Sequence, residues 1–345
     1  MKDHSRIMLI YTGGTIGMMM DPDTGLLKPF EFNSLLERMP ELRQLNCEIV
    51  TRSFDEPIDS SNMTPDHWRE LVGIIEENYE ATDGFVILHG SDTMAYTASA
   101  LSFMLEGLSK PVILTGSQLP IGVLRTDARE NLITSIELAN ATDRTGRPRI
   151  PEVCVYFEYN LYRGNRVYKY SSQDFEAFNS PNYPLLATAG VNLHVFEEFI
   201  RAGSPGPLEV RLSMSDRVSI LPLFPGMPIR MAEKVFEAED VEAIILQTYG
   251  AGNANTTHEF LDLVRSAIES GKIVANISQC RSGGVDQSKY EAGNALRELG
   301  VLSGGDMTLE AALTKLMYLL GNVKDRGEVR RLFTTDLRGE LTSDQ

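Results

Sequence analysis

The chain has 345 residues, 42% of them hydrophobic and 23% charged, and its 48 acidic and 32 basic residues give a net charge of −16. This length accommodates one large or two ordinary domains. A surface this acidic repels nucleic acids and anionic membranes, so we expect neither as a partner. Three cysteines, Cys47, Cys154 and Cys280, are far apart and odd in number, which favours reduced thiols over disulfide bonds or a zinc site.

The N-terminal residues lead directly into an apolar run and show no signal-peptide pattern. No apolar run in the chain reaches the roughly 18 residues that a membrane helix needs. We therefore expect a cytoplasmic protein.

Residues 7–11 are apolar, β-branched and aromatic, which predicts a buried strand. Thr12, Gly13, Gly14 and Thr15 follow, and two adjacent glycines allow a sharp turn that another group can approach closely. The motif lacks the Gly-Lys-Ser/Thr of a phosphate loop and the G-x-G opening of a dinucleotide site. Two interpretations stay open: a tight turn without chemistry, or a nucleophilic Thr15 hydroxyl at the end of the strand.

The segment 18–29 contains two prolines and a glycine and predicts a loop or small hairpin, either a lid over the turn or an ordinary surface loop. An amphipathic helix over 31–39 and a half-buried strand over 47–54 come next. Thr64 is a natural N-cap and Pro65 a natural first helical residue, so we expect a helix from there to about residue 81.

Strands and helices then alternate along the rest of the chain. We expect strands at 84–90, 111–115, 153–157, 218–224, 243–248 and 273–278, helices at 93–106, 126–141, 257–270 and 309–320, and irregular polar structure at 158–183.

This alternation is typical of an α/β protein with parallel sheets and helices on both faces. The Gly/Pro-rich stretch 201–208 indicates a linker between two such blocks. We expect a larger, three-layer N-terminal parallel-sheet domain over 1–200, a linker over 201–216 and a smaller, flavodoxin-like C-terminal parallel-sheet domain over 217–345.

Hydroxyl and acidic side chains follow each strand of the first block. The carboxyl ends of parallel strands meet at one edge of a sheet, where such folds bind ligands. Helix N-termini there favour a carboxylate, and Asp59 or Asp92 suits an ammonium group, which together describe a pocket for an amino acid. Alternatively, these side chains are simply helix caps. The set comprises Thr12, Thr15, Ser60, Ser61, Ser91, Asp92 and Thr115.

The five histidines show no metal-ligand spacing, so we expect neither a metal nor another cofactor. No G-x-S-x-G elbow occurs, which argues against a Ser-His-Asp hydrolase. A hydroxyl nucleophile would then need an activating group other than histidine, and lysine is the known substitute.

Two segments resemble the two signatures of the bacterial-type L-asparaginases: Tyr11-Thr-Gly-Gly-Thr-Ile-Gly17 and residues 84–100. Shorter matches extend the resemblance over essentially the whole chain, and it is strongest to the cytoplasmic, type I branch. These shorter matches are residues 59–65, 161–166, 294–296, 305–308 and 337–342.

The resemblance implies hydrolysis of L-asparagine to L-aspartate and ammonia through an acyl-enzyme ester, without a cofactor. It makes Thr15 the nucleophile and puts Ser91 in place of the family's second threonine. Asp92 would bind the substrate amino group and Ser60 its α-carboxylate. Lys169 would pair with Ser91 and Asp92 as the basic end of a relay.

Donors near Ser91 and Thr115 would hold the amide oxygen. Asn253 matches a residue that reaches the neighbouring subunit's site, so the resemblance also implies a homodimer or homotetramer. The substrate-binding set is then Asp59, Ser60, Ser61, Ser91, Asp92, Thr115 and Asn253.

Besides Ser91, the chain departs from the family pattern at Leu26 and Gln247, and Gly284 stands about where the periplasmic branch has a glutamate from the partner subunit. Leu26 stands where many members carry the lid tyrosine that activates the first threonine, which leaves Tyr249, Tyr290 or water as proton acceptors. Gln247 replaces an arginine of a regulatory asparagine site, which argues against that site.

Three functions stay open at this point. The first is an asparaginase with a minor glutaminase activity. The second is a subunit that supplies ammonia for amidation of tRNA-bound glutamate, against which the −16 charge argues. The third is a non-enzymatic asparagine sensor, which only Leu26 supports.

Overall fold

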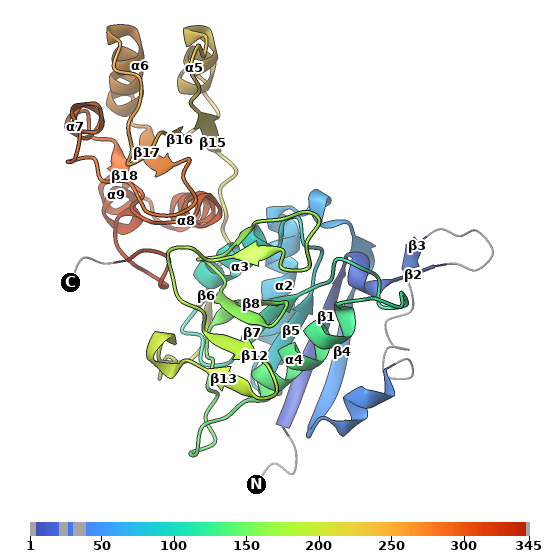
Figure 1. Cartoon of the computed structure of the whole chain (residues 1–345). Helices are drawn as coiled ribbons and strands as arrows, with labels where there is room; N and C mark the ends of the chain where they lie inside the picture. Colours follow the sequence, from blue (N-terminus) through green and yellow to red (C-terminus); the bar gives the residue numbers. More distant parts are fainter. Residues whose placement is uncertain (1–4, 21–26, 30–38, 343–345) are drawn as a thin grey trace. The chain divides into compact units, whose positions relative to one another are not determined.

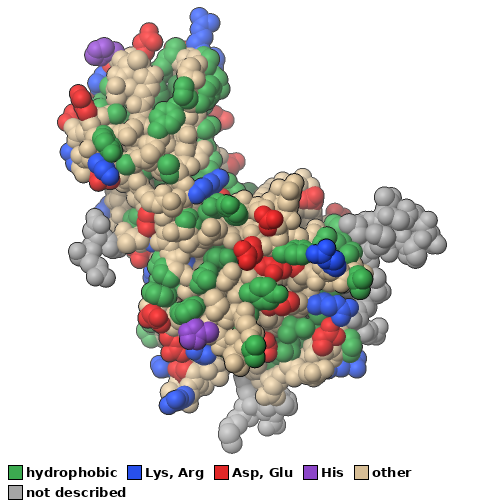
Figure 2. Space-filling model, in the orientation of Figure 1, with side chains coloured by type: hydrophobic (Ala, Val, Ile, Leu, Met, Phe, Trp, Pro, Cys, Tyr) green, Lys and Arg blue, Asp and Glu red, His purple; other side chains and the backbone are tan. Residues whose placement is uncertain are grey.

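The computed structural model describes residues 5–20, 27–29 and 39–342. The chain divides into two units, Met1–Leu212 and Ser213–Gln345 (Figure 1). On the face drawn in Figure 2, Lys and Arg side chains are interspersed with Asp and Glu.

The larger unit is built on an eight-stranded sheet in the order β13-β12-β9-β8-β7-β5-β1-β4. Five strands are parallel, and three antiparallel strands extend the sheet beyond β8. The parallel strands are β1 (Ser5–Gly13), β4 (Cys47–Ile58), β5 (Gly84–Leu88), β7 (Val112–Thr115) and β8 (Val153–Phe157); the others are β9 (Asn160–Arg163), β12 (Ala187–Ala189) and β13 (Leu193–Val195).

Numbered along the chain, the five parallel strands have the spatial order 2-1-3-4-5, because β4 and β5 flank β1. Chain direction across the sheet therefore reverses between β1 and β5. A crevice opens at such a reversal outside the carboxyl ends of the two strands, and ligands bind there.

Helices cover both faces of this sheet (Figure 1). α4 (Ala128–Asn140) packs on the face that carries Leu9 and Val86, and Leu132 and Ile136 join them in one core cluster. α3 (Met94–Met104) packs against β7 and β8, and α2 (Pro65–Asn78) lies along α3. The predicted three-layer α/β arrangement is confirmed.

Several short elements complete the larger unit. They are β2 (Met18–Met20), β3 (Leu27–Pro29), β6 (Leu105–Glu106), β10 (Tyr168–Lys169), β11 (Phe178–Asn179), β14 (Glu209–Val210) and the 3-10 helices at Thr15–Gly17, Pro40–Gln44, Ser60–Asn62 and Glu197–Phe199. β2 and β3 pair as a small hairpin. Leu26 and all but the last residue of the predicted helix 31–39 lie outside the described residues.

The expectation of irregular structure over 158–183 was wrong at its start. β8 turns directly into β9 through Glu158 and Tyr159, which have φ angles of 43° and 69°. A two-residue hairpin turn with two positive φ angles normally contains Asn or Gly. Because Glu158 and Tyr159 are neither, the turn had no sequence signal.

The smaller unit has a four-stranded, all-parallel sheet in the order β15-β16-β17-β18. Helices α5 and α6 share one core cluster with this sheet, while α8 contacts β15 and β16 and packs on α9. The predicted smaller α/β unit is confirmed. Its elements are β15 (Val218–Pro222), α5 (Ile229–Phe236), β16 (Ala243–Thr248), α6 (His258–Glu269), β17 (Ile273–Ser278), α7 (Glu291–Glu298), β18 (Leu302–Ser303), α8 (Leu309–Asn322) and α9 (Arg326–Phe333).

The two units meet between residues 212 and 213, inside the predicted linker 201–216. Part of that stretch is ordered into the larger unit, since β14 pairs antiparallel with β6.

Candidate active site

The turn after β1 depends on its two glycines. Gly13 and Gly14 have φ angles of 130° and 86°, which L-residues with a side chain rarely adopt. A Cβ atom at Gly13 would lie 2.0 Å from the Ile58 carbonyl oxygen, and one at Gly14 would lie 2.6 Å from the Gly90 nitrogen. The glycines therefore let the turn pack directly on neighbouring backbone and present the half-buried Thr15 just beyond it.

Three turns meet at this point. Gly90, which precedes Ser91, also packs against Ser60, because a Cβ atom at Gly90 would lie 2.5 Å from the Ser60 Oγ atom. The Thr93 hydroxyl donates to the Ser60 carbonyl oxygen at 2.7 Å. The neighbouring positions of β4, β1 and β5 thus bring together the turns that carry Ser60, Thr15 and Ser91.

Lys169 reaches this cluster from β10. Its Nζ donates to Ser91 Oγ at 2.8 Å and to Asp92 Oδ1 at 2.6 Å. The lysine side chain is 19% exposed and the Asp92 side chain 65%, so the cluster is open on the carboxylate side. The contacts expected of Lys169 are present, and its role in a reaction stays a prediction.

Asp59 acts locally as a cap. Its Oδ1 accepts from the Ser61 backbone N–H at 2.9 Å and from the Ser61 hydroxyl at 2.7 Å. These two hydrogen bonds lower the pKa of Asp59 below its usual value. The alternative that acids at helix starts are caps therefore describes Asp59 well, while Ser60 lies buried beneath Gly90.

The Thr115 and Thr12 side chains are not aimed at the cluster. Thr115 is fully buried and donates to the Tyr156 carbonyl oxygen at 2.9 Å. Thr12 is buried and donates to the Leu88 carbonyl oxygen at 3.1 Å. Both hydroxyls join strands. The backbone at and after Thr115 reaches the β5 turn, where a Cβ atom at Gly116 would lie 2.3 Å from the His89 carbonyl oxygen.

Asn253 belongs to the smaller unit, as do Tyr249 and Tyr290. Its backbone N–H and C=O pair with those of Tyr249 at 2.8 and 2.9 Å. Within the described residues, the carboxamide oxygen of Asn253 is buried without a hydrogen-bond partner.

Several side chains that hold the site loops were not predicted from the sequence. Asp127 accepts from the backbone N–H groups of Gln118 and Leu119 at 2.8 and 3.0 Å. Asn131 donates to the Gly116 carbonyl oxygen and accepts from the Glu158 N–H, both at 3.0 Å. Asp and Asn at a helix start resemble ordinary caps in sequence, so nothing there pointed to this role.

Tyr11 was also missed, because a tyrosine in a strand resembles a core residue. A Cβ atom at Gly17 would lie 2.2 Å from the Tyr11 Oη atom, so the phenol lies directly beneath the Thr15–Gly17 turn. Burial raises the pKa of Tyr11 to about 12, which moves its ionisation further away from neutral pH.

Within the described ranges, no group of three or more His, Cys, Asp or Glu residues is arranged to hold a metal ion. No described helix combines the length and apolar character required to cross a membrane.

Comparison with known proteins assigns the class. Residues 6–201 match the family model described as "Asparaginase, N-terminal", and residues 217–333 match the "Glutaminase/Asparaginase C-terminal domain". The chain belongs to the asparaginase family.

Individual relatives agree with this assignment. The chain is 40% identical to L-asparaginase 1 of Escherichia coli over 98% of both chains. It superimposes on the crystal structure of L-asparaginase I from Vibrio cholerae with a TM-score of 0.89 and 39% identity, covering 99% of this chain and 100% of that one. The thermostable L-asparaginase from Thermococcus kodakarensis also gives a TM-score of 0.89, with 33% identity, over 98% of this chain and 100% of that one.

Proposed function

We propose that the protein is an L-asparagine amidohydrolase that converts L-asparagine and water to L-aspartate and ammonia. The observation that carries this proposal is the Ser91–Lys169–Asp92 cluster, held on the turn that packs against the Thr15 turn at the sheet's reversal point. Membership of the asparaginase family and the near-complete match to an L-asparaginase support the same activity. A minor glutaminase activity is part of the proposal.

In the proposed first step, Thr15 Oγ attacks the side-chain amide carbon of asparagine. The C–N bond breaks, ammonia leaves with the proton of the hydroxyl, and an aspartyl ester on Thr15 remains. In the second step a water molecule attacks the ester carbon. Ser91 takes a proton from that water while its own hydroxyl proton moves to the Lys169 amine. The proton then returns through Ser91 to Thr15 Oγ as the ester C–O bond breaks and aspartate leaves.

Substrate binding follows from the charges around these groups. Asp92, largely exposed beside Lys169, would hold the substrate ammonium group. Ser60 and Ser61, on the turn that Asp59 caps, would bind the α-carboxylate. Because the Thr115 hydroxyl is committed to Tyr156, donors for the amide oxygen come from the backbone beyond it.

The proposal includes a cytoplasmic homodimer or homotetramer. In it, Asn253 reaches the site of a neighbouring copy, as its family counterpart does. Its side chain is half-buried, and its carboxamide oxygen is buried without a hydrogen-bond partner among the described residues.

The first prediction is that Thr15→Ala lowers kcat for asparagine by about 10⁴-fold or more, because the nucleophile is lost. Ammonia release and thermal unfolding should be measured together, with Thr15→Ser as the control that keeps a hydroxyl. Rapid quenching of the wild type should place one aspartyl group on the peptide that contains Thr15. Near-full activity of a folded Thr15→Ala would show that the nucleophile assignment is wrong.

Binding assays distinguish this activity from the two alternatives, an ammonia-supplying subunit and an asparagine sensor. A subunit acting on tRNA-bound glutamate would bind tRNA at physiological salt, which the −16 charge opposes. An asparagine sensor would bind asparagine tightly and release no ammonia.

A further inference from the structure

His89 is a buried histidine that the proposed reaction does not use. It follows β5 directly, is 1% exposed, and its backbone N–H donates to the Thr115 carbonyl oxygen at 2.8 Å. Its ring lies in a chain of hydrogen bonds within the larger unit. Nδ1 is 2.6 Å from the Gly90 carbonyl oxygen, and Nε2 is 2.9 Å from the Thr97 hydroxyl, which accepts from Trp68 Nε1 at 3.0 Å.

The partners determine where each proton lies. The Gly90 carbonyl oxygen only accepts, so Nδ1 carries the ring proton. Nε2 is then bare and accepts from the Thr97 hydroxyl, whose oxygen accepts the Trp68 indole N–H. With a neutral His89 ring, the Gly90 carbonyl oxygen, both ring nitrogens, the Thr97 hydroxyl and the Trp68 indole N–H all have hydrogen-bond partners. Burial lowers the pKa of His89 to about 4, which also keeps the ring neutral near pH 7.

Gly90 immediately precedes Ser91 in the backbone. It must be glycine, because a Cβ atom there would lie 2.5 Å from Ser60 Oγ. Glycine also permits more backbone rotation than any other residue. Rotation about Gly90 would move Ser91, whose Oγ must stay within hydrogen-bond distance of Lys169 Nζ, now 2.8 Å away.

We propose that His89 is a positioning residue: its Nδ1–H holds the Gly90 carbonyl, restrains the Gly90–Ser91 peptide and thereby keeps Ser91 Oγ against Lys169. This inference rests on the proposed function, in which Ser91 and Lys169 carry a proton. His89 itself touches neither substrate nor the reacting atoms. Losing the restraint lowers kcat by about 10- to 100-fold, the usual result of a small misplacement of a reacting group, and changes KM little.

Two amide substitutions test the two hydrogen bonds of the His89 ring separately. His89→Asn places an N–H donor near the position of Nδ1, so it keeps the contact to Gly90 and loses the one to Thr97. His89→Gln reaches toward the position of Nε2, so it keeps the contact to Thr97 and loses the one to Gly90. We expect His89→Gln to lose activity 10- to 100-fold and His89→Asn to stay within about 3-fold of wild type.

Leu101→Ala is the matched control for lost stability. Leu101 is fully buried on α3, the helix that carries Thr97, and makes no part of the hydrogen-bonded chain. This variant is expected to unfold at a lower temperature with an unchanged kcat. All assays should be run well below the lowest unfolding midpoint, so that every variant is folded.

Hydrogen exchange of the peptide spanning residues 89–93 gives a second measurement that does not depend on turnover. It should be faster in His89→Gln than in wild type and nearly unchanged in His89→Asn. A wild type that releases no ammonia would reject the proposed function, while the exchange result would still decide whether His89 restrains Gly90. Equal kcat and equal exchange in the two His89 variants would overturn the inference.

Discussion

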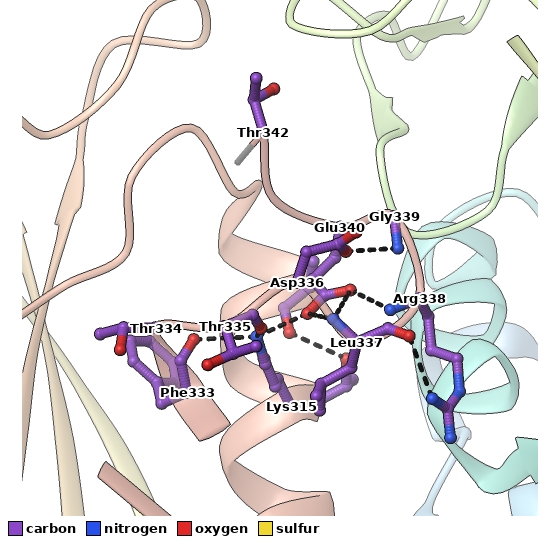
Figure 3. Close-up of polar contacts among 12 residues, drawn as sticks. Lys315, Phe333, Thr334, Thr335, Asp336, Leu337, Arg338, Gly339, Glu340 and Thr342 are labelled. Atoms are coloured by element: carbon purple, nitrogen blue, oxygen red, sulfur yellow. Dashed lines mark hydrogen bonds and ion pairs between the residues drawn. The ribbon is translucent and has the colours of Figure 1, made fainter. Parts of the chain in front are cut away.

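Each unit contains a lysine paired with a carboxylate, and the two pairs differ in how they are enclosed. In the smaller unit, Lys315 and Glu340 are both 0% exposed and lie 2.5 Å apart (Figure 3). Lys315 Nζ also donates to the backbone carbonyl oxygens of Phe333 and Thr335 at 2.8 and 2.6 Å. In the larger unit, Lys169 bonds a serine hydroxyl and a carboxylate that is 65% exposed.

The closed pair, Lys315–Glu340, has no free hydrogen-bonding capacity for a ligand. The three protons of the Lys315 ammonium group have three acceptors, and Glu340 also accepts from the Leu337 and Arg338 N–H groups at 3.0 and 2.6 Å. Burial alone would raise the pKa of Glu340, but Lys315 and these N–H groups outweigh it and hold that pKa below its usual value. The pair fixes the C-terminal segment after α9.

The open pair, Lys169–Asp92, differs in this respect. The Asp92 carboxylate and the neighbouring Ser91 hydroxyl can both form further hydrogen bonds. Sheet order explains where it lies. The larger sheet reverses between β1 and β5, the position at which open α/β sheets bind ligands, whereas the strands of the smaller sheet follow one another in chain order. A lysine–carboxylate pair therefore indicates a site only where the fold leaves it accessible.

The sharpest test of this contrast is Lys169→Met. We expect kcat to fall by about 10³-fold, because proton transfer through Ser91 loses its base. The free energy of unfolding should change by less than about 1 kcal/mol, since the carboxylate that remains is well exposed. Ammonia release and urea unfolding measure the two quantities. Unchanged rates would remove Lys169 from the site.

Lys315→Met should do the reverse. It leaves Glu340 as an unpaired buried charge, which costs about 3 to 5 kcal/mol of unfolding free energy. The folded fraction should keep its kcat at low urea. The double variant Lys315→Met/Glu340→Leu removes both charges and should recover most of the stability. A single variant as stable as the wild type would contradict the structural role.

Much of this arrangement was predictable because periodicity and the parallel-sheet rule act locally. Thr64 and Pro65 marked the start of α2, and the alternation of strands and helices predicted the five parallel strands of the larger sheet and β15, β16 and β17 of the smaller one. The positions of Thr15, Ser60 and Ser91 after adjacent strands predicted that their turns would meet.

The remainder depends on side-chain directions that sequence patterns do not specify. Thr115 has the same residue type and strand-end position as a site hydroxyl, yet its hydroxyl donates to the Tyr156 carbonyl oxygen. His89 was one of five histidines without ligand spacing, and only the packed core shows that Thr97 and Gly90 flank its ring. Contacts between residues far apart in the chain, such as Lys169 with Ser91, came from the family resemblance and not from the pattern.

The glycine turns at the two sheet edges provide a further comparison. Gly14 has a φ angle of 86° and packs on Gly90, whereas Gly250, after β16, has a φ angle of 51° and open space around its Cβ position. Gly250→Ala should cost only the left-handed strain, about 1 kcal/mol of unfolding free energy. Gly14→Ala must also displace the Thr15 turn, so kcat should fall about 100-fold. Kinetics and urea unfolding of both variants test this, and equal effects would show that the two turns are packed alike.

The smallest expected effect concerns the turn between β8 and β9 in the larger unit, which combines backbone strain with a carboxyl group of raised pKa. Among the described residues, the non-glycine positions with positive φ angles are Glu158 and Tyr159, in the turn between β8 and β9. Burial, followed by the charges of Asp127, Glu130 and Glu176, raises the pKa of Glu158 from 4.5 to about 7. The folded state therefore favours the protonated carboxyl, and the stability this contributes is complete below about pH 4.5 and lost as pH rises through 7.

Glu158→Asn removes the charge and introduces a residue that tolerates a left-handed conformation. We expect a gain of about 1 kcal/mol in unfolding free energy at pH 8 and a smaller gain at pH 5, where the native carboxyl is largely neutral. Glu158→Gln, which removes only the charge, should gain stability at pH 8 and none at pH 5. Urea unfolding at the two pH values separates the effect of the Glu158 charge from the effect of backbone strain. An equal gain from Glu158→Asn at both pH values would assign the whole gain to the backbone. A loss of stability at both would mean that Glu158 does not strain the turn.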